Sequence, residues 1–107
     1  MSADRTLFPD QLKELEAALR DGRCLLIDVR ERHEYEAGHI PLAINRPMSQ
    51  LGSWQAEVDG DLQIVLYCKT GGRSRRCADA LRARGLREVY ILEGGYSAWS
   101  RSVPKDR

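Results

Sequence analysis

The most informative stretch of this chain is Tyr67-Cys68-Lys69-Thr70-Gly71-Gly72-Arg73-Ser74. An apolar run from Ile64 to Tyr67 leads into it, and a helical pattern from about Ser74 to Arg84 leads out of it. A strand, a glycine-rich loop and a helix in this order direct the N–H groups of the loop and the positive end of the helix dipole at one small volume. Because ligands of open α/β sheets bind at the carboxyl ends of strands, we expect a functional site at this loop.

Cys68 is the predicted nucleophile of this loop. The thiolate is the reactive form of cysteine, and a helix N-terminus with neighbouring cations lowers the thiol pKa. Lys69 and Arg73 flank Cys68 and supply those cations. We therefore predict a lowered pKa for Cys68. The alternative is a buried, inert cysteine at a strand end, followed by an ordinary turn.

The remaining loop residues are expected to shape an anion-binding backbone. Gly71 and Gly72 permit positive φ values and a close approach of the backbone to a ligand. Ser74 is expected to cap the helix that starts there. The N–H groups from Lys69 to Ser74, including that of Thr70, then converge on a bound anion.

Strand and helix patterns alternate along the chain, which predicts an α/β fold with a mainly parallel sheet. Spacing alone does not give the strand order. A loose tail is expected after the last helix. We predict helices at about 9–20, 31–36, 48–58, 74–84 and 97–101, strands at 24–29, 43–45, 63–67 and 88–92, and the tail at 102–107.

Asp28 interrupts an otherwise apolar run from Cys24 to Val29, and a buried carboxylate needs a partner. It either caps the turn before the next helix, or it has a functional role. In the functional case it accepts hydrogen bonds near the Cys68 loop or steadies Arg30. Both explanations remain open from the sequence, and both can hold together.

Composition indicates one ordinary globular domain over residues 1–107, with a core at about 8–100. Of the 107 residues, 42% are hydrophobic and 31% charged. No apolar run is long enough to span a membrane, and the polar start of the chain lacks a signal-peptide core, so we expect a cytoplasmic protein. The three cysteines do not have the spacing of a disulfide framework or a zinc site. Cys24 and Cys77 are expected to fill the core.

Three further segments extend the pattern of the Cys68 loop. They are Leu26-Ile27-Asp28-Val29-Arg30-Glu31, the run from Tyr35 to Asn45 that contains Gly38-His39-Ile40-Pro41, and Glu93-Gly94-Gly95-Tyr96-Ser97-Ala98-Trp99. Together with the loop, and in this order, they resemble the rhodanese family of sulfurtransferases across about Phe8 to Trp99. The resemblance implies a five-stranded sheet with helices on both faces. Two positions depart from the family pattern: Leu42 replaces a usual glycine, and Arg46 a usual apolar residue.

The resemblance implies an enzyme that carries sulfur as a Cys68 persulfide and follows ping-pong kinetics. A small anionic sulfur donor such as thiosulfate, or a persulfide donor, loads the cysteine. Cyanide, a cellular thiol or a carrier protein removes the sulfur. Lys69 and Arg73 are expected to attract the donor. The family mechanism needs no metal and no organic cofactor. The sequence does not predict the physiological donor, the acceptor, the pathway or the oligomeric state.

Charge is distributed unevenly, although the net charge is only +1. The segment from Cys68 to Arg87 contains seven basic residues and one acidic residue, Asp79. A local excess of positive charge focuses anions toward the loop. It fits thiosulfate or an acidic carrier protein. This charge distribution is weaker support for nucleic-acid binding, because the whole chain is not strongly basic.

Other functions remain as alternatives. One is a rhodanese-like binding module without catalysis, although such modules often lack the cysteine, and another is a dedicated protein-to-protein sulfur relay. A cysteine phosphatase or arsenate reductase on the same scaffold is disfavoured. Those enzymes have five residues between cysteine and arginine, whereas four separate Cys68 from Arg73 here. A shorter loop suits one sulfur atom better than a tetrahedral oxyanion, and we expect negligible phosphatase activity.

Overall fold

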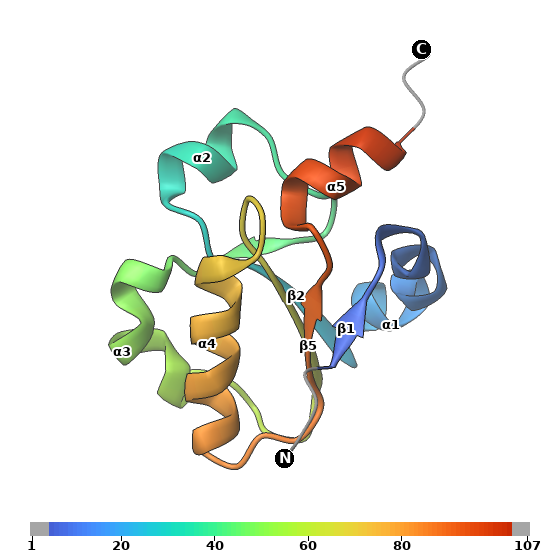
Figure 1. The fold of residues 1–107 in the computed structure, drawn as a ribbon. Coiled ribbons are helices and arrows are strands. Elements are labelled where there is room, and N and C mark those ends of the chain that lie inside the picture. The colour runs from blue at the N-terminus through green and yellow to red at the C-terminus, as the bar shows by residue number, and fades with distance from the viewer. Residues whose placement is uncertain (1–4, 104–107) are drawn as a thin grey trace.

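The structure is a computed structural model and describes residues 5–103. Its centre is a five-stranded sheet in which every pair of neighbouring strands is parallel, in the order β1-β5-β4-β2-β3 (Figure 1). The predicted α/β class with a mainly parallel sheet is therefore confirmed. The strands are β1 (Thr6–Leu7), β2 (Cys24–Asp28), β3 (Ile44–Asn45), β4 (Gln63–Tyr67) and β5 (Val89–Leu92).

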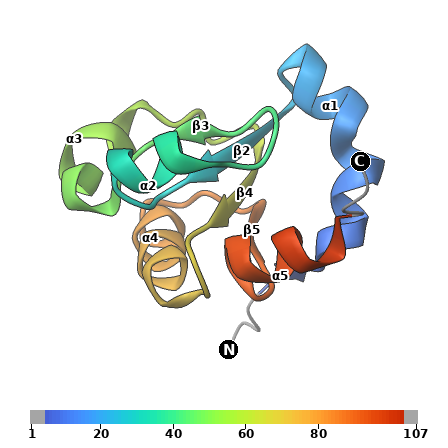
Figure 2. The same ribbon diagram turned by 90° about the horizontal axis from the view of Figure 1, so that it is seen from above.

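Helices cover both faces of this sheet, as Figure 2 shows from above. On one face lie α3 and α4, and on the other lie η1, α1 and α5, where η marks a 3₁₀ helix. The helices are η1 (Pro9–Leu15), α1 (Glu16–Asp21), α2 (Arg32–Ala37), η2 (Met48–Gln50), α3 (Leu51–Trp54), η3 (Gln55–Glu57), α4 (Gly72–Ala83) and α5 (Gly95–Ser102).

Alternate side chains of β4 form the centres of two hydrophobic cores. Ile64 and Leu66 pack toward α3 and α4, while Val65 and Tyr67 pack toward η1 and α5. All four side chains are fully buried. Burial on both faces explains why this strand is a continuous apolar run without a polar alternation. It also fixes the position of the loop that follows Tyr67.

Most predicted element bounds are shifted by one or two residues, and three differences are larger. The helix predicted at 9–20 is a 3₁₀ helix up to Leu15, where Leu12 and Leu15 share one face of a three-residue turn. The helix predicted at 48–58 is broken into η2, α3 and η3, and Gly52 lies within it. Strand β1 has only two residues and was not predicted. The loose tail expected at 102–107 is wrong at Ser102, which is the last residue of α5, and residues 104–107 lie outside the described part of the chain.

Within residues 5–103, no helix combines the length and the apolar character that crossing a bilayer requires.

Candidate active site

The loop between β4 and α4 lies at the carboxyl end of the sheet, between α2 and α5 (Figure 1). Helix α4 begins at Gly72, two residues earlier than predicted, and Gly71 is its N-cap residue. Gly71 has a φ of 143°, a conformation that glycine adopts without steric cost. Ser74 is therefore not the N-cap, and this prediction was wrong. Instead, Ser74 lies in the first turn and its hydroxyl donates to the Gly71 carbonyl at 3.0 Å.

The Cys68 thiol lies in the concave side of this loop and is 2% exposed. The Gly71 N–H donates to Cys68 Sγ at 3.0 Å, and the Ser74 hydroxyl is 3.7 Å from the same sulfur. Burial alone would raise the pKa of Cys68, but hydrogen bonds from the Ser74, Gly71 and Arg73 backbone and the Ser74 hydroxyl outweigh it. The pKa of Cys68 is lowered, as predicted. The prediction had assigned this effect to the helix N-terminus together with Lys69 and Arg73, and the groups that lower the pKa are the loop backbone at the helix N-terminus and the Ser74 hydroxyl.

The two loop cations have different surroundings. Lys69 is exposed. Arg73 is partly buried and forms a two-pronged ion pair with Glu34 of α2, with N–O distances of 2.8 and 3.1 Å. The hydrogen bond to Glu34 raises the pKa of Arg73, and the nearby Cys68 raises it further. The role of Arg73 in attracting a donor stays a prediction, and the pairing with Glu34 reduces the net positive charge that Arg73 presents.

Helix α5 holds the start of the loop from the other side. Tyr96 N–H donates to the Cys68 carbonyl at 2.8 Å, and Ser97 N–H donates to the Lys69 carbonyl at 3.1 Å. Gly95 makes this close approach possible, because a Cβ there would lie 2.5 Å from the Cys68 carbonyl oxygen. The first two carbonyls of the loop are thus bound to α5.

Asp28 and Arg30 form a buried ion pair beside this arrangement. The Arg30 guanidinium donates to both carboxylate oxygens of Asp28, the shortest distance being 2.8 Å, and to the Gly38 carbonyl at 2.7 Å. It also lies over the rings of Tyr67 and Tyr96, at 5.8 and 4.4 Å from their centroids. Of the open explanations, Asp28 steadies Arg30 and supports the turn through the Arg30 N–H.

Known proteins resemble this chain in sequence and in fold. A family model described as the rhodanese-like domain matches residues 11–102, which is most of the chain. The chain belongs to the rhodanese-like domain family. The uncharacterized protein YqhL of Bacillus subtilis is 45% identical over 78 residues, which are 73% of this chain and 62% of that protein. The chain therefore spans less than two thirds of that relative.

Several solved structures share this fold over nearly the whole length of the chain. The human single-domain sulfurtransferase TSTD1 is 27% identical, with a TM-score of 0.79 over 95% of this chain and 100% of that one. A rhodanese-related protein of Thermoplasma volcanium is 28% identical, with a TM-score of 0.79 over 94% and 95%. A Rhodopseudomonas palustris protein described as a possible tyrosine phosphatase is 26% identical, with a TM-score of 0.78 over 92% and 81%. The implied five-stranded rhodanese-like fold is thus confirmed.

The other two cysteines of this rhodanese-like domain lie in its cores. Cys24 and Cys77 are free and buried, as predicted for core residues. Burial raises the pKa of Cys24 to about 11 and that of Cys77 to about 12. Both thiols therefore stay protonated at neutral pH. Among residues 5–103 no cluster of three or more metal-ligating side chains exists.

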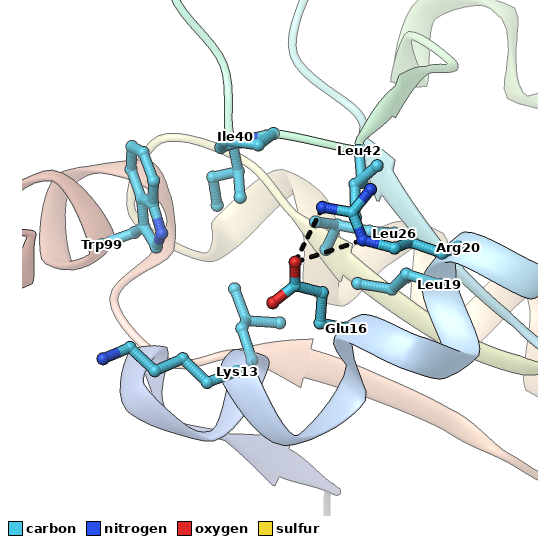
Figure 3. Close-up of a pocket in the computed structure, with 10 residues that line it drawn as sticks. Lys13, Glu16, Leu19, Arg20, Leu26, Ile40, Leu42 and Trp99 are labelled. Atoms are coloured by element: carbon cyan, nitrogen blue, oxygen red, sulfur yellow. Dashed lines mark hydrogen bonds and ion pairs between the residues drawn. The ribbon is translucent and has the colours of Figure 1, made fainter.

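A cavity of about 290 Å³ lies away from the loop, between η1, α1, the turn after Ile40 and α5 (Figure 3). Its lining is mostly apolar and includes Ile40 and Trp99, and an ion pair between Glu16 and Arg20 lies at one side. No residue of the Cys68 loop lines it. The cavity is therefore separate from the candidate active site.

Two site residues were missing from the sequence predictions. The sequence analysis included Glu34 only in the helix predicted at 31–36, and Gly95 only in the segment from Glu93 to Trp99. Glu34 is 39 positions from Arg73, so the sequence contained no local signal for their pairing. For Gly95 a signal was present, because two adjacent glycines before a helix often mark a close backbone approach.

Proposed function

We propose that this rhodanese-like protein is a sulfurtransferase that carries sulfane sulfur as a persulfide on Cys68. The observation that supports this most directly is the 3.0 Å hydrogen bond from Gly71 N–H to Cys68 Sγ at the start of α4. A sulfur atom at this position accepts hydrogen bonds from backbone N–H groups and lies at the positive end of a helix dipole. Both stabilise a thiolate, and both would stabilise the terminal anion of a persulfide.

The first half-reaction loads the cysteine. The Cys68 thiolate attacks the outer sulfur of a donor such as thiosulfate, and an S–S bond forms between Sγ and that sulfur. The bond between the outer sulfur and the sulfonate sulfur breaks, and its electron pair leaves with sulfite. With a persulfide donor the leaving group is a thiolate. The loop N–H groups from Lys69 to Ser74 stabilise the charge during this transfer.

The second half-reaction unloads the cysteine. A nucleophile, either cyanide in the assay or a cellular thiol or carrier protein, attacks the outer sulfur of the persulfide. A bond forms between nucleophile and sulfur, the S–S bond breaks, and its electron pair returns to Cys68 as the thiolate. Atoms and charge balance without a metal or an organic cofactor. Two separate half-reactions predict ping-pong kinetics.

The burial of Cys68 limits which donors fit. At 2% exposure its side chain admits an incoming group that presents a single terminal sulfur. Phosphate esters present three oxygens around a central atom, and the arginine expected to bind them is paired with Glu34. We therefore favour sulfur transfer over the phosphatase alternative. A rhodanese-like binding module is disfavoured because the pKa of Cys68 is lowered, a property that binding alone does not need.

Steady-state kinetics test this proposal. Thiosulfate and cyanide are varied together, and thiocyanate is measured with the wild-type protein, Cys68→Ser and Cys77→Ser. Parallel reciprocal plots, with activity lost only in Cys68→Ser, are expected. Thiocyanate production that survives Cys68→Ser would refute the mechanism. Hydrolysis of an aryl phosphate that depends on Cys68 would support the phosphatase instead.

We also propose a cytoplasmic location, supported by the chemistry of the thiols. A working thiolate needs a reducing compartment, and all three cysteines are free. Cell fractionation with a tagged protein tests this. Recovery in an exported fraction would contradict it.

A further inference from the structure

Glu34 forms a direct ion pair with the Cys68 loop through Arg73. Its two carboxylate oxygens face the two terminal nitrogens of Arg73, at 2.8 and 3.1 Å. Parallel bonds of this kind are the strongest geometry for an arginine–carboxylate pair. The side chains are only 25% and 32% exposed, so solvent screens the pair incompletely.

The position of Glu34 is fixed by its own helix. Its Oε1 also accepts a hydrogen bond from the Glu31 N–H at 2.9 Å, which forms a capping box at the start of α2. The hydrogen bond from Arg73 lowers the pKa of Glu34 to about 2. The carboxylate is therefore ionised throughout the physiological pH range, and its negative charge stays beside Arg73.

This carboxylate changes the charge that a donor meets. Arg73 interacts electrostatically with Cys68, but Glu34 neutralises the charge of Arg73. Glu31 also interacts electrostatically with Arg73. Lys69 remains as an exposed loop cation. The charge of the Cys68 thiolate itself opposes an incoming anion. Electrostatic attraction therefore stabilises a bound dianion only weakly at this site. Glu34 and the thiolate repel a monoanion less strongly than a dianion.

We propose that Glu34 is a specificity-determining residue that disfavours dianionic sulfur donors and favours donors with a single negative charge or none, such as the persulfide of a small thiol or of a protein. This inference rests on the proposed sulfurtransferase function and names its donor class. Glu34 acts through Arg73 and does not touch the reacting sulfur. Thiosulfate is then a usable but weak donor.

Two probes separate charge from chemistry. Thiosulfate is a dianion, and methanethiosulfonate is a monoanion of similar shape in which a methyl group replaces one oxygen. Both transfer the same kind of outer sulfur, with sulfite or methanesulfinate as leaving group. We expect wild-type kcat/KM to be higher for methanethiosulfonate. In Glu34→Gln, kcat/KM for thiosulfate should rise roughly tenfold at low salt, mainly through a lower KM, while methanethiosulfonate should gain less.

The matched control is Glu36→Gln. Glu36 lies on the same helix, is exposed, and pairs with Arg32 at 3.0 Å instead of with the loop. It should leave the ratio of the two donors unchanged. Glu34→Asp keeps the charge and should also keep the wild-type preference. An unchanged ratio in Glu34→Gln, with activity present, would overturn the inference. Absence of sulfur loading from either donor in the wild-type protein would instead overturn the proposed function.

The wild-type protein alone gives a second test, which does not depend on the folding of a variant. Salt weakens attraction between a cationic site and an anion, and more so for a dianion. Because Glu34 neutralises Arg73, kcat/KM for thiosulfate should fall no more steeply with salt than that for methanethiosulfonate. A clearly steeper fall for thiosulfate would show a net cationic site and contradict the inference.

Discussion

At the scale of single residues, the hydroxyl of Ser74 has a larger role than the sequence suggested. It donates to the Gly71 carbonyl and lies 3.7 Å from Cys68 Sγ. It is thus placed to turn toward the sulfur when the thiol loses its proton. The backbone of the same residue is among the groups that lower the pKa of Cys68.

Ser74→Ala should therefore raise the pKa of Cys68. A lowered pKa keeps the thiolate present at a pH where an ordinary thiol is protonated, so the change shifts the pH profile of persulfide formation toward higher pH. Loading at neutral pH should slow by roughly threefold to tenfold and recover in alkaline buffer. Ser102→Ala is the control, because the Ser102 hydroxyl likewise donates a hydrogen bond to the carbonyl three residues earlier, that of Trp99 on α5. Identical pH profiles for both variants would contradict the role of the Ser74 hydroxyl.

Leu42 is a second residue with a measurable effect. It is the described non-glycine residue with a positive φ, 74°, at the position where the family pattern has glycine. Leu42→Gly and Leu42→Ala remove the same packing, but only glycine relieves the backbone strain. The glycine variant should be more stable than the alanine variant by about 0.5–1 kcal/mol in urea unfolding. An alanine variant of equal or greater stability would show that the turn is unstrained.

At the scale of elements, the contact between α5 and the loop explains why a distant helix is part of the site. Two N–H groups at the start of α5 bind the Cys68 and Lys69 carbonyls. These two carbonyls are thus bound by α5, while the N–H groups of Gly71, Arg73 and Ser74 interact with the Cys68 sulfur. The element therefore orients the loop without touching a substrate.

Gly95→Ala tests this contact, and Gly22→Ala is its control. Both glycines have positive φ, 60° and 85°, so both variants share the backbone strain. A Cβ at Gly95 would lie 2.5 Å from the Cys68 carbonyl oxygen, whereas nothing lies within 4 Å of a Cβ at Gly22. Gly95→Ala should therefore lower the free energy of unfolding by about 1–3 kcal/mol more than Gly22→Ala and should slow sulfur loading. Equal effects would mean that α5 does not position the loop.

At the scale of the whole molecule, the sequence predicted the central strands better than the edges. Strand β4 was predicted at its observed bounds because burial on both faces imposes a continuous apolar run. Strand β1 has two residues, Thr6 and Leu7, which are too few to show a period. The strand order was likewise not encoded in spacing, because parallel crossovers of similar length are compatible with several orders.

The candidate site divides in the same way. Cys68 and the backbone around it are local in sequence, so the strand-loop-helix pattern was enough to predict them. The partners of the loop are not local. Glu34 reaches Arg73 from α2, and Gly95 approaches from α5, and both contacts depend on the assembled sheet.

The buried Asp28–Arg30 ion pair is expected to stabilise the assembled fold. Asp28 is fully buried and Arg30 is 5% exposed, and the pair joins β2 to the Gly38 carbonyl and to the Tyr96 ring. Asp28→Asn leaves a buried cation without its counter-charge and should cost about 3–5 kcal/mol in urea unfolding. Asp21→Asn removes an exposed pair with Arg23 and should lower the free energy of unfolding far less than Asp28→Asn. Similar losses of unfolding free energy in the two variants would contradict the claim that burial makes the Asp28–Arg30 pair important for stability.

The most direct test of the central claim is the mass of the intact protein after incubation with thiosulfate or methanethiosulfonate, followed by peptide mapping. We predict a gain of one sulfur atom, located on the peptide that contains Cys68, absent in Cys68→Ser and removed by cyanide as thiocyanate. The thiols of Cys24 and Cys77 should remain unmodified because both are buried and protonated. A folded protein that gains no sulfur from either donor, or that gains it on Cys77, would contradict the account.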